Sequence, residues 1–236
     1  NYQNVASVPF AANDAKIFSE YCHKTLGLPK ENIKVYIDAT YGKILGALST
    51  LKQISQAYKG DINVIFYYAG HGVPNEKNNE AYLLPADATP SMLEACLPLS
   101  SLYSSIGSID AKQVIVFMDA CFSGSRRENG MIVSARGEAI KPKKDMVTGN
   151  VVVLSAADGS ETAYPYKEKG HGLFTYFLLK KLKESRGNVT LGDLADYVKT
   201  NVSQKSIVVN NKSQTPTISS SAQMQDVWRT MKLFRK

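Results

Sequence analysis

The chain has 236 residues, of which 44% are hydrophobic and 21% are charged. This length and composition fit one α/β domain over residues 1–236 better than two small domains. No apolar run is long enough for a membrane span, and the polar start Asn1-Tyr2-Gln3-Asn4 is not a signal peptide. We therefore expect a soluble protein without a membrane partner, and we favour the cytoplasm over secretion, although a removed leader would leave the same start.

The net charge of +7 raises nucleic-acid binding as an alternative. Much of the excess positive charge lies within residues 125–149, which show no hydrophobic periodicity and predict a long mobile loop. This stretch contains no interleaved aromatic residues and no known nucleic-acid-binding motif. A solvated basic loop is the favoured interpretation, so we expect no nucleic-acid partner.

Hydrophobic periodicity and turn residues predict helices and strands that alternate along the chain. Helices are predicted over residues 13–27, capped by Asn13 or Asp14, and over 42–58, 99–106, 172–184 and 190–204. Strands are predicted over residues 33–37, 63–68, 81–84, 113–118, 151–155 and 217–219, and residues 221–236 form a C-terminal tail. The alternation predicts an α/β fold with a mostly parallel central sheet and helices on both faces.

The three cysteines, Cys22, Cys96 and Cys121, form no C-x-x-C motif. Their odd number argues against a disulfide framework and against a cysteine-rich zinc site. Cys22 lies in a predicted helix and Cys96 in a connecting segment, where packing is the favoured role. Cys121 is the cysteine whose surroundings indicate chemistry.

Two apolar runs each end at a cluster of small residues that carries a reactive side chain. His71 lies in Tyr67-Tyr68-Ala69-Gly70-His71-Gly72, and Cys121 lies in Asp119-Ala120-Cys121-Phe122-Ser123-Gly124. Because the carboxyl ends of parallel strands form the crevice where α/β proteins do their chemistry, adjacent strands would bring His71 and Cys121 together. A thiol paired with an imidazole in this way favours a cysteine peptidase.

These two segments resemble the His and Cys boxes of the caspase/metacaspase clan of cysteine peptidases, and the resemblance covers residues 2–220. Asp-Ala-Cys is similar to the metacaspases and bacterial caspase-like peptidases rather than to the Gln-Ala-Cys of caspases. The resemblance implies a caspase-like fold, in which a buried strand precedes a segment like the first four residues here. We therefore expect that strand to be absent, which leaves an unfilled slot between residues 33–37 and 63–68. An upstream fragment that supplies it is an expected partner.

In the chemistry that this implies, Cys121 is the nucleophile and His71 is the base that later protonates the leaving amine. The resemblance implies the backbone N–H groups of Gly72 and Cys121 as donors to the oxyanion. A second Gly-His-Gly string, centred on His171, precedes a predicted helix. A helix N-terminus disfavours a cationic imidazolium, so His171 is the poorer base. His23 is expected at the surface or at the boundary of the core.

Asp119 precedes Cys121 by two residues on one strand, so both side chains face the same side. An unpaired carboxylate would raise the pKa of the thiol, so a receptor for a substrate cation is the better interpretation of Asp119. The metacaspase resemblance implies that Asp119 and Asp14 bind an Arg or Lys before the scissile bond. A helix cap is the alternative role for Asp14. Ser155, at the end of the next strand, is a further candidate for this pocket.

The sequence therefore predicts a cysteine endopeptidase that cuts protein or peptide substrates after Arg or Lys. The alternatives are a caspase-fold regulatory module with little turnover and a basic nucleic-acid-binding domain. The basic loop would be a substrate of the chain's own activity, with autocleavage candidates at Arg126, Arg127, Arg136 and Lys144. We expect no cofactor and no metal, because no D-x-D-x-D loop is present, although some metacaspases require calcium.

Overall fold

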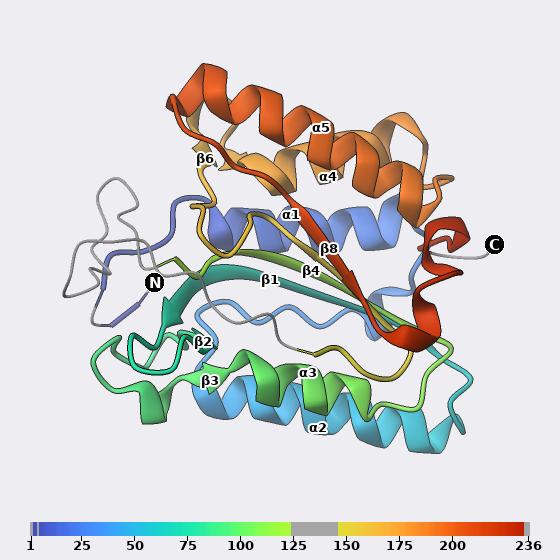
Figure 1. Cartoon of the computed structure of the whole chain (residues 1–236). Helices are drawn as coiled ribbons and strands as arrows, with labels where there is room; N and C mark the ends of the chain where they lie inside the picture. The colour runs from blue at the N-terminus through green and yellow to red at the C-terminus, as the bar shows by residue number, and fades with distance from the viewer. Residues whose placement is uncertain (1, 4, 124–145, 234–236) are drawn as a thin grey trace.

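A mixed six-stranded sheet in the order β3-β2-β1-β4-β5-β8 organises the computed structural model, which describes residues 2–3, 5–123 and 146–233 (Figure 1). Its strands are β1 (Asn63–Pro74), β2 (Ala81–Leu83), β3 (Leu97–Pro98), β4 (Gln113–Cys121), β5 (Val151–Ser155) and β8 (Thr217–Ser220). The central strands β1, β4 and β5 pair in parallel, whereas the edge strands β2, β3 and β8 are antiparallel to their neighbours. A separate two-stranded sheet contains β6 (Pro165–Tyr166) and β7 (His171–Gly172).

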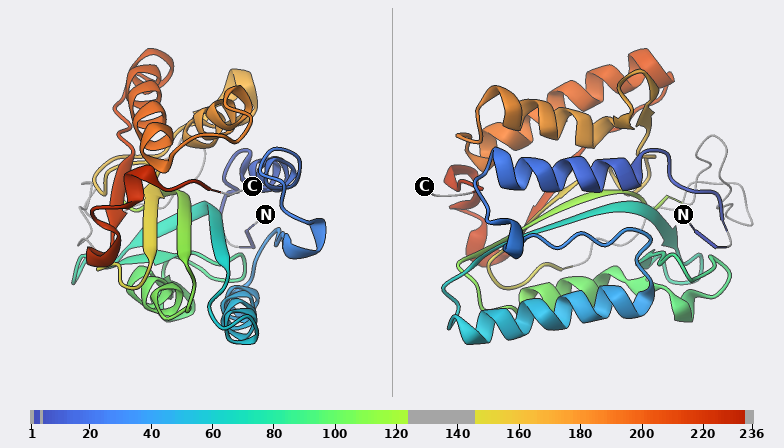
Figure 2. Two further views of the ribbon diagram at one scale, coloured as in Figure 1. Left: turned by 90° about the vertical axis from the view of Figure 1, so that its right-hand side faces the viewer. Right: turned by 180° about the vertical axis from the view of Figure 1, so that it is seen from behind.

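Helices cover both faces of the large sheet, as the sequence predicted (Figures 1 and 2). One face carries α1 (Ala11–Lys24) and α4 (Leu173–Glu184), and α5 (Leu191–Asn210) packs beside α4. The other face carries α2 (Tyr41–Ala57) and α3 (Leu99–Gly107). Short 3₁₀ helices are η1 (Lys30–Asn32), η2 (Leu93–Ala95), η3 (Lys167–Lys169), η4 (Ala222–Met224) and η5 (Trp228–Thr230).

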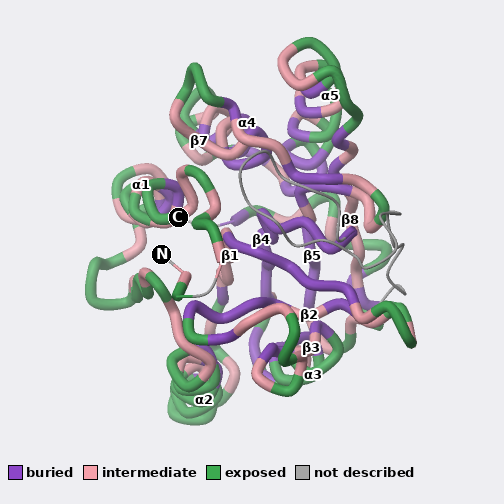
Figure 3. Tube along the Cα trace, turned by 90° about the vertical axis from the view of Figure 1, so that its left-hand side faces the viewer, coloured by how far each residue is buried: buried purple, intermediate pink, exposed green. Residues whose placement is uncertain are grey.

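Alternating side chains on β4 divide the core into two layers. Phe117 packs with Phe18 and Phe174 on the side of α1 and α4, whereas Val116 packs with residues of α2 and α3. Between these layers, β4 and β5 are buried along almost their whole length (Figure 3). Because side chains alternate with a period of two along a strand, Asp119 and Cys121 share the face of Phe117. The chemistry-bearing side of β4 is therefore the side that α1 and α4 cover.

The predicted strand over residues 33–37 is wrong, because these residues form no strand. Val35 and Tyr36 are 43% and 46% exposed. A strand needs a hydrogen-bonded neighbour. On the side of β1 that faces away from β4, the described residues provide a pairing strand only at residues 72–74, where β2 pairs with β1. The β-branched pattern of residues 33–37 thus has no ladder to join.

The boundaries of β1 and β4 also differ from the prediction. Both strands continue past the predicted ends at residues 68 and 118, so that His71 and Cys121 lie within strands rather than after them. Small residues such as Gly70 and Ala120 have low strand propensity, but each is a register partner of the other in the parallel ladder. Pairing between neighbours outweighs the local preference here.

The predicted cap of the first helix is wrong as well. Phe10 precedes α1 in a left-handed conformation with φ of 66°, and no side chain caps the helix. Asn13 and Asp14 lie in the first turn of α1, and their side chains contact the segment around β7 instead.

Candidate active site

Parallel pairing of β1 with β4 places His71 and Cys121 directly opposite each other. Adjacent strands are about 4.8 Å apart, and register partners in a parallel pair project to the same face of the sheet. Both residues are buried, with 5% exposure for His71 and 7% for Cys121. The structure thus brings the predicted base and the predicted nucleophile to one position at the end of the central strands.

The N-terminal segment fixes the imidazole of His71. Its Nε2 lies 2.7 Å from the carbonyl oxygen of Ala6. A carbonyl only accepts hydrogen bonds, so Nε2 carries the hydrogen, and the neutral ring keeps Nδ1 as its basic nitrogen. The backbone N–H of His71 donates to Tyr2 Oη at 2.8 Å, and the ring of Tyr2 lies 4.7 Å from the imidazole. These contacts hold the imidazole in one orientation.

The thiol of Cys121 has partners suited to both of its protonation states. Its Sγ lies 3.1 Å from Ser123 Oγ and 3.4 Å from the backbone carbonyl oxygen of Glu161. The Glu161 carbonyl accepts a hydrogen bond from the neutral thiol, and the buried hydroxyl of Ser123 is able to donate one to a thiolate. Glu161 is itself anchored, because its carboxylate accepts hydrogen bonds from the backbone N–H and the hydroxyl of Thr215.

Gly72 lies against the main chain of Cys121. A Cβ at Gly72 would be 2.5 Å from the carbonyl oxygen of Cys121 and 2.3 Å from Cδ1 of Phe122. Neither approach leaves room for a side chain, so only glycine allows this contact. Gly72 is therefore packed directly beside Cys121.

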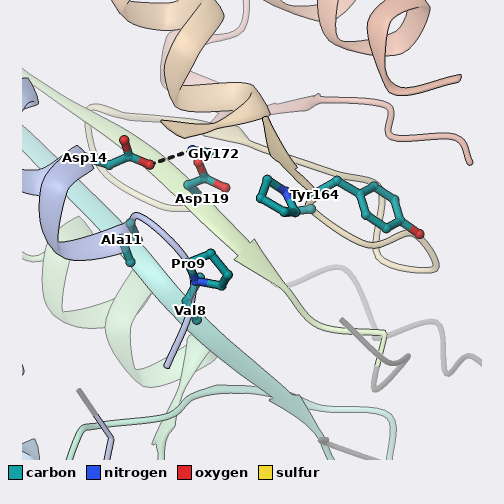
Figure 4. A pocket seen from close by; sticks show the side chains of 10 residues that line it. Val8, Pro9, Ala11, Asp14, Asp119, Tyr164 and Gly172 are labelled. Atoms are coloured by element: carbon teal, nitrogen blue, oxygen red, sulfur yellow. Dashed lines mark hydrogen bonds between the residues drawn. The ribbon is translucent and has the colours of Figure 1, made fainter. Parts of the chain in front are cut away.

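An acidic pocket is lined in part by Asp119 (Figure 4), which shares its face of β4 with Cys121. Residues of the N-terminal segment, α1, β1, β4 and the β6–β7 region line it, namely Val8, Pro9, Ala11, Asp14, Ala69, Asp119, Ala163, Tyr164, Pro165 and Gly172. Asp14 is 1% exposed and Asp119 is 6% exposed. The two predicted acids, which are far apart in sequence, therefore meet in one pocket.

The two carboxylates approach each other around Gly172. A Cβ at Gly172 would be 2.5 Å from Asp119 Oδ2 and 3.3 Å from Asp14 Oδ2. The backbone N–H of Gly172 donates to Asp14 Oδ2 at 2.8 Å, and the hydroxyl of Thr175 donates to Asp119 Oδ2 at 2.7 Å. His171 Nδ1 lies 2.5 Å from the other oxygen of Asp14. Both acids are thus oriented by donors on or next to α4.

Burial changes the protonation behaviour of this pocket. It raises the pKa of Asp14, and the hydrogen bonds from His171 and from the Gly172 N–H oppose that rise. Burial also raises the pKa of Tyr67 well above its usual value, and the charges of Asp119 and Asp14 add to this effect. Tyr67 is therefore a neutral hydroxyl that lies 2.7 Å from Thr175 Oγ1. Two carboxylates this close would repel each other if both were ionised.

The two other cysteines, Cys22 and Cys96, are buried in the core. Burial raises the pKa of Cys22 to about 12 and that of Cys96 to about 11. Their thiols therefore remain protonated near neutral pH and are poor nucleophiles. This agrees with the packing roles expected for both residues.

The remaining predicted site residues lie apart from the pocket or outside the described chain. Ser155 ends β5 opposite Met118 and is not among the residues that line the pocket. His23 is half-buried at the end of α1, where Nδ1 contacts the carbonyl oxygen of Leu28 at 2.8 Å. The autocleavage candidates lie outside the described residues.

Within residues 2–3, 5–123 and 146–233, no helix has the length and apolar character needed to cross a membrane. In the same ranges, no three His, Cys, Asp or Glu side chains cluster so as to hold a metal ion.

Sequence reasoning missed several residues of the site. Ser123 could have been found from the sequence, because it follows Cys121 by two residues, which is the same spacing by which Asp119 precedes Cys121. Thr175 and the pairing of His171 with Asp14 could not have been found in this way, since His171 and Asp14 are 157 positions apart. The contacts of Tyr2 and Ala6 with His71 likewise depend on tertiary structure.

The fold and the paired Cys and His define a caspase-like α/β protein. The caspase domain family of peptidases matches residues 1–227, and the chain belongs to this family. It is 29% identical to a paracaspase of Dictyostelium discoideum over 158 residues, which are 67% of this chain and only 36% of that protein.

Two solved structures share the fold. A Geobacter sulfurreducens protein has a TM-score of 0.67 at 17% identity, over 94% of this chain and 88% of that one. Caspase-1 of Spodoptera frugiperda has a TM-score of 0.61 at 15% identity, over 89% of this chain and 78% of that one.

Proposed function

We propose that the chain is a cysteine endopeptidase that uses Cys121 and His71 to cleave peptide bonds after Arg or Lys. The observation that carries this proposal is the continuity of the site along β4. Cys121 lies opposite His71, and Asp119 lies two residues earlier on the same face and lines the acidic pocket. Nucleophile and specificity determinant are therefore parts of one strand.

The reaction would begin with transfer of the Cys121 proton to Nδ1 of His71. The thiolate then attacks the carbonyl carbon of the scissile bond, and the backbone N–H groups of Gly72 and Cys121 stabilise the oxyanion. His71 returns the proton to the departing amine, which leaves an acyl-enzyme. A water molecule, deprotonated by His71, hydrolyses this intermediate and restores the thiol. The Ala6 carbonyl keeps the imidazole oriented throughout.

Recognition of the basic residue would use both the apolar and the acidic side chains that line the pocket. The apolar side chains of Val8 and Pro9 suit the methylene groups of Arg or Lys. Asp14 and Asp119 then supply the negative charge for the guanidinium or ammonium group, and a planar guanidinium is able to bind carboxylates in a bidentate manner. A substrate with an acidic or neutral residue before the scissile bond would supply no positive charge to pair with these carboxylates.

A panel of fluorogenic peptides with Arg, Lys, Asp or Leu before the scissile bond tests the proposal. We expect rapid turnover of the Arg and Lys peptides by the wild type and none by Cys121→Ala. Equal turnover of the Asp peptide would contradict the assigned specificity. Absence of turnover for all four peptides would favour the alternative of a regulatory module.

Self-processing remains a prediction, because Arg126, Arg127, Arg136 and Lys144 lie outside the described residues. Incubation of wild type and Cys121→Ala, followed by intact-mass analysis, tests it. Fragments that end in Arg or Lys only in the wild type would support self-processing. A single uncut mass in both, from an enzyme active on peptides, would contradict it.

A further inference from the structure

A second imidazole lies at the acidic pocket, where it contacts Asp14. His171 Nδ1 and Asp14 Oδ1 are 2.5 Å apart, and their side chains are 19% and 2% exposed. Two more hydrogen bonds join α1 to this segment, one from the Gly172 N–H to Asp14 Oδ2 and one from Asn13 Nδ2 to the Gly170 carbonyl oxygen at 3.1 Å. The contact is therefore part of a fixed junction between α1 and β7, rather than a chance meeting of surface side chains.

We propose that His171 controls the charge of the specificity pocket by sharing one proton with Asp14, so that affinity for a basic substrate residue rises when this proton leaves. The inference rests on the proposed preference for Arg or Lys. With the shared proton, the Asp14–His171 pair has no net charge, whichever residue holds it. Without the proton, the pair has one negative charge, which faces the substrate's cation together with Asp119.

The surroundings of His171 make it the residue suited to this role. Histidine is the side chain that ordinarily changes charge between pH 5 and 8. Two acidic groups lie near His171, namely Asp14 on α1 and Asp119 on β4, across Gly172. Two tyrosines also lie near it: the ring of Tyr176 on α4 is 6.3 Å from the imidazole, and Tyr166 is its register partner on β6, with Lys205 Nζ 5.4 Å from the Tyr166 ring. The preceding turn contains the charged residues Lys167, Glu168 and Lys169. Of these, Asp14 is the one placed between the imidazole and the pocket.

The coupling must act in both directions. A cation in the pocket stabilises the negatively charged form of the Asp14–His171 pair, so it promotes loss of the shared proton. Binding of a basic ligand should therefore lower the pH at which His171 titrates. An uncharged ligand of the same shape should leave the titration of His171 unchanged.

The first test compares kcat/KM for an Arg peptide with that for the matched citrulline peptide from pH 5 to pH 8. The ratio of the two removes the titration of Cys121 and His71, because both peptides depend on it equally. In the wild type we expect this ratio to fall about tenfold toward pH 5, in the ordinary range of coupling between sites.

The matched variant is His171→Asn, whose amide N–H still donates to Asp14 but carries no charge. A coupled pair loses its last proton at a higher pH than the carboxylate alone. The fall of the ratio should therefore move to lower pH in His171→Asn. A flat ratio in the wild type, or identical curves for both proteins, would overturn the proposal.

The second test needs no turnover and uses Cys121→Ala. The imidazole resonances of His171 are followed by NMR against pH, with and without Nα-acetyl-arginine amide. We expect the arginine ligand to move the midpoint about one pH unit lower, which corresponds to tenfold coupling. The citrulline analogue should leave it in place, and Asp14→Asn should abolish the shift.

An unchanged midpoint with the arginine ligand would overturn the role of His171. A shifted midpoint in Cys121→Ala, combined with no cleavage of any peptide by the wild type, would instead refute the proposed peptidase function and leave the pocket inference intact. The two failures are thus distinguishable.

Discussion

Gly70-His71-Gly72 and Gly170-His171-Gly172 are identical tripeptides whose imidazoles have different hydrogen-bond partners. The ring of His71 donates from Nε2 to a neutral carbonyl and lies opposite a thiol, which leaves Nδ1 as a base. The ring of His171 uses Nδ1 toward a buried carboxylate, which makes it a charge partner for a pocket. The chemistry of a Gly-His-Gly tripeptide therefore depends on the elements packed against it and not on the tripeptide itself.

Separate replacement of the two histidines should produce the largest difference in activity between variants. His71→Ala and Cys121→Ala should each lower kcat/KM about 10³-fold or more, because the members of a catalytic unit fail together. His171→Ala should retain most of its kcat/KM for Arg peptides at neutral pH, because Asp14 keeps its carboxylate and the Gly172 N–H still donates to it. A variant His71→Ala that retains activity while His171→Ala loses it would reverse the assignment.

The acidic partners of the second tripeptide should control specificity. Asp119→Asn preserves the shape of the side chain but removes one charge, and loss of a buried charge partner costs about 2–5 kcal/mol. We expect kcat/KM for Arg peptides to fall about 100-fold while turnover of a Leu peptide changes little. Asp14→Asn should act in the same direction with a smaller effect. An equal loss for Arg and Leu peptides would indicate damage to the thiol site instead.

The final glycines of the two tripeptides contact different parts of the site. A methyl group at Gly72 would meet Phe122 and the Cys121 carbonyl, whereas one at Gly172 would meet the carboxylates of Asp119 and Asp14. Gly72→Ala should therefore slow turnover of all peptides about tenfold or more, since overpacking a tight site costs about 1–3 kcal/mol. Gly172→Ala should lower mainly the ratio of Arg to Leu turnover. Indistinguishable substrate profiles of the two variants would contradict the separation of roles.

The smallest expected effect concerns the contact between Ser123 and the thiol of Cys121. Its hydroxyl lies 3.1 Å from the thiol of Cys121 and is able to donate to a thiolate. One hydrogen bond contributes about 1 kcal/mol net, so Ser123→Ala should slow alkylation of Cys121 by iodoacetamide about fivefold at pH 7. Ser123→Thr keeps the hydroxyl as a control. An unchanged rate in Ser123→Ala would remove Ser123 from the site.

The parts of the structure that depend on chain-local patterns could be predicted from the sequence. The apolar runs before His71 and Cys121 predicted two central strands, and the rules of α/β topology then predicted that their ends lie together. The helices on both faces follow in the same way from periodicity. Asp119 was predictable because its position relative to Cys121 depends only on the period of a strand.

The parts that depend on a distant partner could not be predicted in this way. Residues 33–37 have strand-forming side chains but no neighbour to pair with, and Asn13 and Asp14 have the composition of a helix cap but contact β7 instead. Asp14 was identified through the resemblance to metacaspases, and its contact with His171 has no sequence signal. Tertiary packing determined each of these outcomes.

Covalent labelling reports the nucleophile and the specificity pocket in a single experiment. The protein is incubated with two peptidyl chloromethyl ketones that differ only in Arg or Asp next to the reactive group, and the labelled cysteine is located by peptide mass analysis. We predict one adduct per chain at Cys121, formed much faster with the Arg reagent and slowed by Asp119→Asn, with Cys22 and Cys96 unlabelled. Equal rates with both reagents, or labelling at Cys22 or Cys96 rather than Cys121, would contradict the account.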